Sequence, residues 1–306
     1  MKSIIQISLI SSIVLILSNT IGAQSRYFDE RYVYTQAFIN PQLINPGAYG
    51  ANMNHQILIN YRNKWATFPG SPKTITLNYN GAVGNRLGFG AGFVSDSYGE
   101  LEMSKAYGGL SYTIKSETNQ IGFGLSAEYI KHGLSGSTLT SELLAKDDPV
   151  INAAVVGAEY FDASVGIYGI YMDKLSYGLV FPSMISSRIT ETNLETPERD
   201  FGVIAHLGYK LTAQQADVSL TPSIFIKRLN SVPTHVDLNL RMGFLKEQFT
   251  GGVMYTLGAD KRLGFLLGTQ VENFNFFYTY NTSSNPFQDY NNGSHELTLG
   301  ISFGGK

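Results

Sequence analysis

Apolar and polar residues alternate along the C-terminal part of the chain. Every second side chain is apolar from Val236 to Phe244, and the same pattern returns from Glu296 to Phe303. Successive side chains of a β-strand point to opposite faces, so each segment has one apolar face and one polar face. Strands of about ten residues with this alternation, separated by turn residues, are typical of outer-membrane β-barrels. The pattern therefore predicts membrane-spanning strands.

The same alternation, followed along the chain, predicts an all-β fold. We expect a transmembrane, antiparallel, up-and-down β-barrel of about 14 strands in the bacterial outer membrane, an even number being usual for such barrels. The expected strands are 55–62, 73–80, 86–95, 104–114, 120–131, 160–171, 175–182, 200–210, 217–228, 234–244, 249–257, 262–270, 274–281 and 295–303.

The connections between these strands predict an orientation. Longer connections follow odd-numbered strands, and mostly short polar turns follow even-numbered ones. Outer-membrane barrels have longer extracellular loops and short periplasmic turns. We therefore expect the loops at 63–72, 132–159, 183–199 and 282–294 outside the cell, and turns such as 245–248 in the periplasm.

The N-terminal residues do not fit the barrel pattern. Residues 1–23 combine Lys2, an apolar stretch and a small-residue cleavage site, which is typical of a cleaved secretory signal peptide. Residues 24–53 are rich in aromatic residues and contain two Asn-Pro pairs that interrupt the chain. We expect an ordered segment there, either a plug, a periplasmic tether or a partner-binding arm, with a simple leader as the alternative. The barrel itself is expected at 54–306.

Composition supports a membrane barrel over a soluble one. Only 15% of the residues are charged, against about 25% in ordinary soluble domains. A soluble sandwich or barrel would carry charges on its outer face, whereas the polar face here is mostly Gly, Ser, Thr, Asn and Tyr. The net charge of −2 argues against nucleic acid as a partner, and the absence of Cys excludes disulfides and thiol chemistry.

Candidate chemistry is sparse, and we expect no catalytic, cofactor or metal site. His132 and Ser135 are close in sequence, but no acid is evident to orient them. Gly88, Gly90 and Gly92 resemble a phosphate loop, yet they fall within a strand and are expected to face the lumen, where bulky neighbours need room.

Four charged residues are predicted to face the barrel lumen. We expect them to form a hydrogen-bonded polar network, with ion selectivity of a pore as the alternative role. They are Glu128, Asp237, Arg241 and Glu296.

Three stretches resemble the PorP/SprF family of type IX secretion membrane proteins. Residues 34–46 resemble the family's entry motif, although 45–50 read Asn-Pro-Gly-Ala-Tyr-Gly where the family usually has Asn-Pro-Ala-Tyr-Ala-Gly. Residues 61–74 resemble its Arg-x-x-Trp and Gly-x-Pro-x-Thr stretch. In the C-terminal third, residues 236–239 and 293–296 also match the family. Earlier in the chain, residues 95–99 depart from the family's usual Asn-Asp-x-x-Gly turn.

This resemblance implies a non-enzymatic outer-membrane component of type IX secretion, a system linked to gliding. Its role would be to support export or surface attachment of adhesin-like proteins, with secretion-machinery components, a large secreted surface protein and outer-membrane lipid as partners. The alternatives are a general porin or small-solute channel and a barrel hydrolase or acyltransferase. Aromatic residues and Arg often dominate protein interfaces. The candidate partner-binding residues are Tyr34, Phe38, Asn45, Pro46, Arg62 and Trp65, with barrel bracing as the alternative role.

Overall fold

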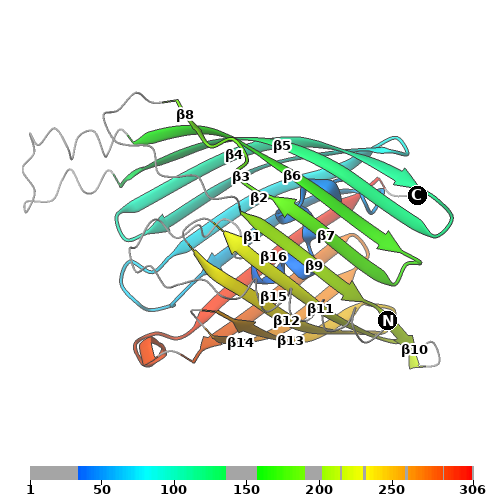
Figure 1. Cartoon of the computed structure of the whole chain (residues 1–306). Coiled ribbons are helices and arrows are strands. Elements are labelled where there is room, and N and C mark those ends of the chain that lie inside the picture. The colour runs from blue at the N-terminus through cyan, green and yellow to red at the C-terminus, as the bar shows by residue number, and fades with distance from the viewer. Residues whose placement is uncertain are drawn as a thin grey trace, which may run out of the picture.

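The chain folds into a single antiparallel sheet that closes on itself. This computed structural model describes residues 34–135, 157–189, 202–213, 216–229, 232–258, 261–284 and 286–304. The sheet closes because strand β9 (Val203–Tyr209) pairs with β7 (Leu175–Phe181) on one side and β11 (Val218–Leu229) on the other. Figure 1 shows the tilted strands surrounding a central space. Closure leaves no sheet edge unpaired within the barrel wall.

Fourteen strands form the wall, which confirms the predicted number. The eleven not yet named are β1 (His55–Asn63), β2 (Lys73–Val83), β3 (Leu87–Tyr98), β4 (Leu101–Lys115), β5 (Asn119–Leu134), β6 (Ala158–Tyr171), β12 (Val232–Phe244), β13 (Phe249–Leu257), β14 (Arg262–Val271), β15 (Phe274–Ser283) and β16 (Ser294–Phe303). Each overlaps an expected strand. Two short strands add to the wall, β8 (Ser187–Arg188) beside β6 and β10 (Leu211–Ala213) beside β11.

Apolar side chains of the wall point outward and polar side chains point inward. Leu240 and Leu299 are 38% and 48% exposed, whereas their neighbours Asn239 and Thr298 are 7% and 0% exposed. A soluble barrel would show the opposite arrangement, because its apolar face would fill the interior. The alternation predicted from the sequence therefore places the apolar faces toward lipid.

The two ends of the barrel differ. At one end, here called the turn end, short turns such as 116–118, 172–174, 245–248 and 272–273 join the strands. At the other, the loop end, lie the longer connections 64–72, 135–157, 182–202 and 284–293. In Figure 1 the loop end is on the left and the turn end on the right. Much of the two longest predicted loops lies outside the described residues.

Several turn residues adopt left-handed backbone conformations. Met172 and Asp173 have φ angles of 50° and 55°, as a two-residue type I′ hairpin turn requires. Leu245, Lys246 and Glu247 have φ angles of 49°, 57° and 69°. These turns hold the strands in the right-handed twist of the wall. Among the described residues, no helix is long and apolar enough to cross a membrane.

Candidate functional site

Residues 34–53, here called the lumen segment, lie inside the barrel. The segment contains three short 3-10 helices, η2 (Thr35–Phe38), η3 (Pro41–Leu43) and η4 (Pro46–Ala48). Figure 1 shows it in blue, enclosed by the strands. It starts near the loop end and runs to the turn end, where β1 begins. We therefore consider the segment and the wall around it as the candidate functional site.

At the loop-end side, the carboxylate of Glu296 on β16 holds the start of η2. It accepts hydrogen bonds from the backbone N–H groups of Thr35, at 2.9 Å, and Gln36, at 3.3 Å, and from Asn60 Nδ2 at 3.0 Å. Glu296 is fully buried. Gln36 Nε2 also donates to Thr279 Oγ1 at 3.0 Å. Glu296 therefore joins the lumen segment to β1 and β16, and we call these contacts the Glu296 latch.

Tyr34 fixes the same end of the segment. Its hydroxyl lies 2.7 Å from Thr76 Oγ1, and the Arg62 guanidinium lies 5.7 Å from its ring centre. Lys227 Nζ donates to the Tyr34 carbonyl oxygen at 3.4 Å. Burial raises the pKa of Tyr34 to about 12, although the Thr76 hydrogen bond and Arg62 act in the opposite direction. Tyr34 is therefore an uncharged, enclosed part of the packing.

Asn45, Pro46 and Gly47 occupy a socket of glycines toward the turn end. Asn45 Nδ2 donates to the Ile167 carbonyl oxygen at 2.9 Å, and Asn45 Oδ1 accepts from Gly47 N at 2.9 Å. The wall leaves no room for larger residues here. A Cβ atom on Gly124 would lie 2.2 Å from the Pro46 carbonyl carbon, and one on Gly166 would lie 2.1 Å from Asn45 Oδ1. We call these wall positions the glycine socket, which consists of Gly88, Gly90, Gly122, Gly124 and Gly166.

Tyr49 completes the socket on β3 and β4. Its ring lies over Gly90, where a Cβ atom would approach to 2.5 Å, and its carbonyl oxygen accepts from Ser111 Oγ at 2.6 Å. The expectation that Gly88 and Gly90 face the lumen because a bulky group needs room is confirmed, since a Cβ atom on Gly88 would lie 2.0 Å from the Tyr49 carbonyl oxygen. Gly92 makes room in the same way for Tyr107.

The four predicted lumen charges are inside or at the rim of the wall, but they form separate groups. Glu128 pairs with Lys105 at 3.1 Å and accepts from Ser164 Oγ at 2.6 Å. Glu296 belongs to the latch described above. The wall around Glu128 therefore presents a buried ion pair to the lumen instead of an open row of charges.

Asp237 and Arg241 belong to two further groups, so the four charges do not form the single network expected from the sequence. Asp237 pairs with Lys227 at 2.7 Å, and Arg241 pairs with Glu247 at 3.0 Å. The two residues are four apart on β12, so they lie on one face at different depths in the barrel. No local pattern marks Lys105 or Lys227 as the partners, although both occupy inward-facing positions of the strand alternation.

The candidate partner-binding residues divide into two groups. Tyr34, Asn45 and Arg62 are 2%, 1% and 3% exposed, and Pro46 is also buried. While the lumen segment occupies the barrel, these four cannot contact a partner, which favours the bracing role for them. Phe38 is partly buried against two apolar clusters of the lumen.

Trp65 lies instead at the loop-end rim. It packs edge-on against Tyr98, with ring centres 6.1 Å apart, and Lys64 Nζ lies 5.2 Å from its ring centre. Trp65 and Thr67 have φ angles of 54° and 73°, which are unusual for residues other than Gly. Ala66 N donates to the Gly293 carbonyl oxygen at 2.7 Å. The rim loop is therefore held in a strained but well-supported conformation.

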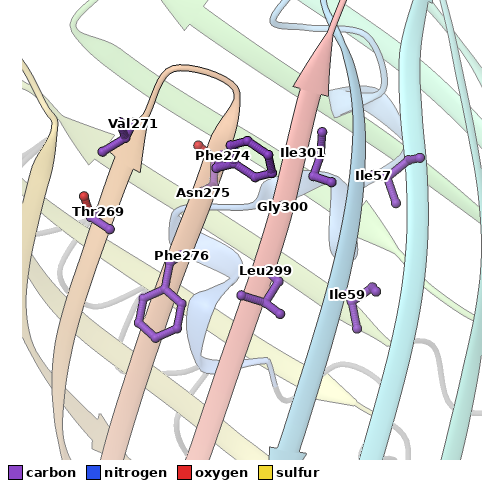
Figure 2. A pocket seen from close by; sticks show the side chains of 10 residues that line it. All are labelled: Ile57, Ile59, Thr269, Val271, Phe274, Asn275, Phe276, Leu299, Gly300 and Ile301. Carbon is purple, nitrogen blue, oxygen red and sulfur yellow. The ribbon is translucent and has the colours of Figure 1, made fainter.

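A shallow hollow lies on the outer, apolar side of the wall. It has a volume of about 350 Å³ and is formed by β1, β14, β15 and β16. Figure 2 shows Ile57, Leu299 and Ile301 beside Phe274 and Phe276 around it. These residues belong to the lipid-facing surface, so the hollow is separate from the lumen.

One residue of the candidate catalytic pair lies in the barrel wall. His132 lies within strand β5 and not in a loop as expected, and its ring packs edge-on against Tyr160 at 5.8 Å. Among the described residues, no group of three or more His, Cys, Asp or Glu side chains is placed to hold a metal ion. The polar groups that the structure brings together instead connect the lumen segment to the wall.

Comparison with known sequences identifies the family. The profile of the type IX secretion system membrane protein PorP/SprF matches residues 28–301. The chain belongs to this family. Membership and the closed barrel place the protein in the bacterial outer membrane. A family of secretion-system membrane proteins also fits a role other than catalysis. No curated protein sequence matches the chain.

Three solved structures are similar to this chain at low sequence identity. The CymD monoaromatic hydrocarbon channel is 14% identical over 94% of this chain and 95% of its own, with a TM-score of 0.48. The TodX deltaS2S3 mutant monoaromatic hydrocarbon channel is 10% identical over 89% and 94%, with a TM-score of 0.47. The Acinetobacter baumannii outer membrane protein Omp33 is 6% identical over 82% and 98%, with a TM-score of 0.46.

Proposed function

We propose that the protein is a non-enzymatic component of type IX secretion that supports export or surface attachment of adhesin-like proteins. Family membership supports involvement in this secretion system. The occupied lumen is the observation that favours this role over a general porin. Glu296 holds the lumen segment at one end, and the glycine socket encloses it at the other. A barrel filled in this way suits a scaffold better than a permanently open channel.

The orientation follows from the two ends of the barrel. In our proposal the loop end faces outside the cell and the turn end faces the periplasm, because outer-membrane barrels have longer extracellular loops. Residues 1–23 serve as a signal peptide that is removed after export. The loop end is then the surface available to a protein that remains attached outside the cell.

The rim around Trp65 is the surface that we assign to this partner. Tyr98 beside it is 47% exposed. The rim loop is fixed to β16 through Trp65 N, which donates to Ser294 Oγ at 3.3 Å. Rigid exposed aromatic residues are common energetic centres of protein interfaces. Trp65 therefore keeps the partner-binding assignment, whereas buried Tyr34, Asn45, Pro46 and Arg62 lie where the lumen segment contacts the wall.

Gene deletion tests the proposed function. Surface proteins of the native host would be identified by biotinylation of intact cells, in the wild type and in a deletion strain. The deletion should remove one or more large secreted proteins from the surface and leave small-solute uptake unchanged. If every secreted protein still reaches the surface and only solute permeability changes, the porin alternative is correct.

Point variants test the rim. Trp65→Ala should reduce surface display of the affected protein, while Trp65→Phe should retain much of it. Tyr290→Ala is the matched control, because Tyr290 is also an aromatic residue at the loop end and is 74% exposed. Equal losses with Trp65→Ala and Tyr290→Ala would argue against a specific contact at Trp65.

A further inference from the structure

We infer that the lumen segment is a removable plug, held by the Glu296 latch, and that it leaves the glycine socket during secretion. This inference rests on the proposed function for its biological role, but the opening itself can be measured without that function. Three features of the structure support it: the unpaired polar atoms at the contact surface, the lining of the socket and the position of the latch.

The contact surface between segment and wall contains buried polar groups beside apolar clusters, in which Leu43 and Ile44 pack with wall residues such as Ile204. Gln36, Asn40, Asn60 and Asn78 are all buried at or near it, and each has one side-chain atom without a hydrogen-bond partner. Burying an unpaired polar atom opposes close association. The segment also forms no strand pairing with the described wall. These features weaken the hold of the apolar clusters on the segment, which favours a contact that can be reversed.

The wall beneath the segment would remain open after the segment left. Gly88 and Gly90 on β3, Gly122 and Gly124 on β5, and Gly166 on β6 have no side chains to fill the vacated space. Each lies in a strand whose hydrogen bonds do not depend on the segment. We therefore expect removal of the segment to create a water-filled path and to leave the wall intact.

The latch lies directly beneath the rim. Ser294, which accepts a hydrogen bond from Trp65 N at 3.3 Å, is two residues before Glu296 on β16. A protein that binds the rim loop would therefore act on the strand that carries the latch. Because the rim loop and the latch share β16, release of the lumen segment would begin at its loop-end side, at Glu296 and Tyr34.

The first test is conductance of the purified full-length protein in planar lipid bilayers. Gly124→Val should raise conductance at least tenfold, because the added side chain would clash with the Pro46 backbone. Val also suits a strand, so β5 should tolerate it. Gly108→Val on neighbouring β4 is the matched control, since a Cβ atom there meets nothing within 4 Å. It should conduct like the wild type.

A disulfide lock provides the second test and does not require the plug to be disrupted. A Cβ atom on Gly166 would lie 3.1 Å from Asn45 Cγ, so side chains at these two positions meet directly. The double variant Asn45→Cys/Gly166→Cys can be made in this Cys-free chain. Its oxidised form should block surface display in cells, and a reductant should restore it. The reduced double variant and the Asn45→Cys single variant serve as controls.

The outcomes separate the inference from the proposed function. If Gly124→Val folds, as judged by heat-modifiable migration, and conducts no more than Gly108→Val, the wall closes the lumen without the segment and the inference fails. If the oxidised lock supports full display, the segment is a static filler and the inference also fails. Either result leaves the proposed function intact, because gene deletion tests that separately.

Discussion

The Glu296→Ala substitution gives the most direct measure of what holds the lumen segment in place. In the wild type, the Glu296 carboxylate accepts from Thr35 N, Gln36 N and Asn60 Nδ2. Hydrogen bonds to a charged group contribute roughly 1.5–3 kcal/mol each. Alanine leaves these donors without the carboxylate, but it also removes the cost of burying its charge.

These opposing effects set the expected magnitude. Two of the three bonds, those from Thr35 N and Gln36 N, reach the segment. At the middle of the range they give about 4–5 kcal/mol, and the relief of charge burial reduces this to roughly 3 kcal/mol in favour of the released segment. A change of that size corresponds to roughly a hundredfold increase in the released population. Glu296→Gln keeps one acceptor oxygen at the same place, so its effect should be about tenfold.

Thiol labelling can measure this population. Ala37→Cys and Ala48→Cys place single thiols at positions that are 1% and 4% exposed. Under native conditions the labelling rate of a buried thiol follows the population of the open state. Glu296→Ala should accelerate labelling at both positions by roughly a hundredfold. Acceleration at Ala37 alone would indicate local fraying of η2.

The reasoning would be refuted by unchanged labelling. If Glu296→Ala gives a folded, heat-modifiable barrel in which both thiols react at the wild-type rate, the latch does not hold the segment. If the variant does not fold, Glu296→Gln gives the same comparison with a smaller expected effect.

Three further predictions concern the barrel itself. Leu240→Arg should lower the free energy of unfolding in lipid by roughly 2–4 kcal/mol, because the side chain faces the membrane. Asn239→Ser should lower it by less than about 1.5 kcal/mol. Equal losses for the two variants in urea unfolding would contradict the assignment of the outward and inward faces of β12. Burial acts to raise the pKa of Glu247, but hydrogen bonds from Lys210 and Ser219 and the charge of Arg241 hold it below its ordinary value of 4.5. The stability advantage of wild type over Glu247→Gln should therefore be full above pH 4.5 and fade as the pH falls further. A pH-independent difference, or the same loss in Glu272→Gln, would refute the assignment of this stability to the contacts of Glu247. A thiol at Ser284 should react with an impermeant maleimide on intact cells and a thiol at Gln248 should not; the reverse would overturn the orientation.

Strand alternation was enough to predict the wall, because period two is a local property of the chain. The sequence alone could therefore predict the number of strands and the strands around Leu240 and Leu299. The aromatic and Pro residues of the lumen segment distinguish it from the strands, but they do not predict its path through the barrel. That path depends on contacts between Gln36 or Asn45 and strands more than a hundred residues away. No local pattern encodes such pairings.

The site residues show the same limit. Glu128, Asp237 and Glu296 were predicted to face inward from alternation alone. Their partners Lys105, Lys227 and the η2 backbone depend on which strands lie opposite one another. The partner-binding residues were chosen by residue type, and type cannot distinguish an aromatic side chain at the rim, such as Trp65, from one enclosed in the lumen, such as Tyr34.

The glycines explain how one sequence can specify both a barrel and its contents. Gly47 stands in a departure from the family's usual motif, and a Cβ atom there would lie 2.8 Å from both Gly122 O and Tyr168 N. Wall and segment therefore meet through backbone atoms, without side chains between them. Glycine in a strand interior is otherwise unfavourable, so its repeated use on the inner face of β3 and β5 requires a compensating contact. The lumen segment provides that contact, and its Asn-Pro-Gly turn fits a socket that the wall has no other structural reason to form.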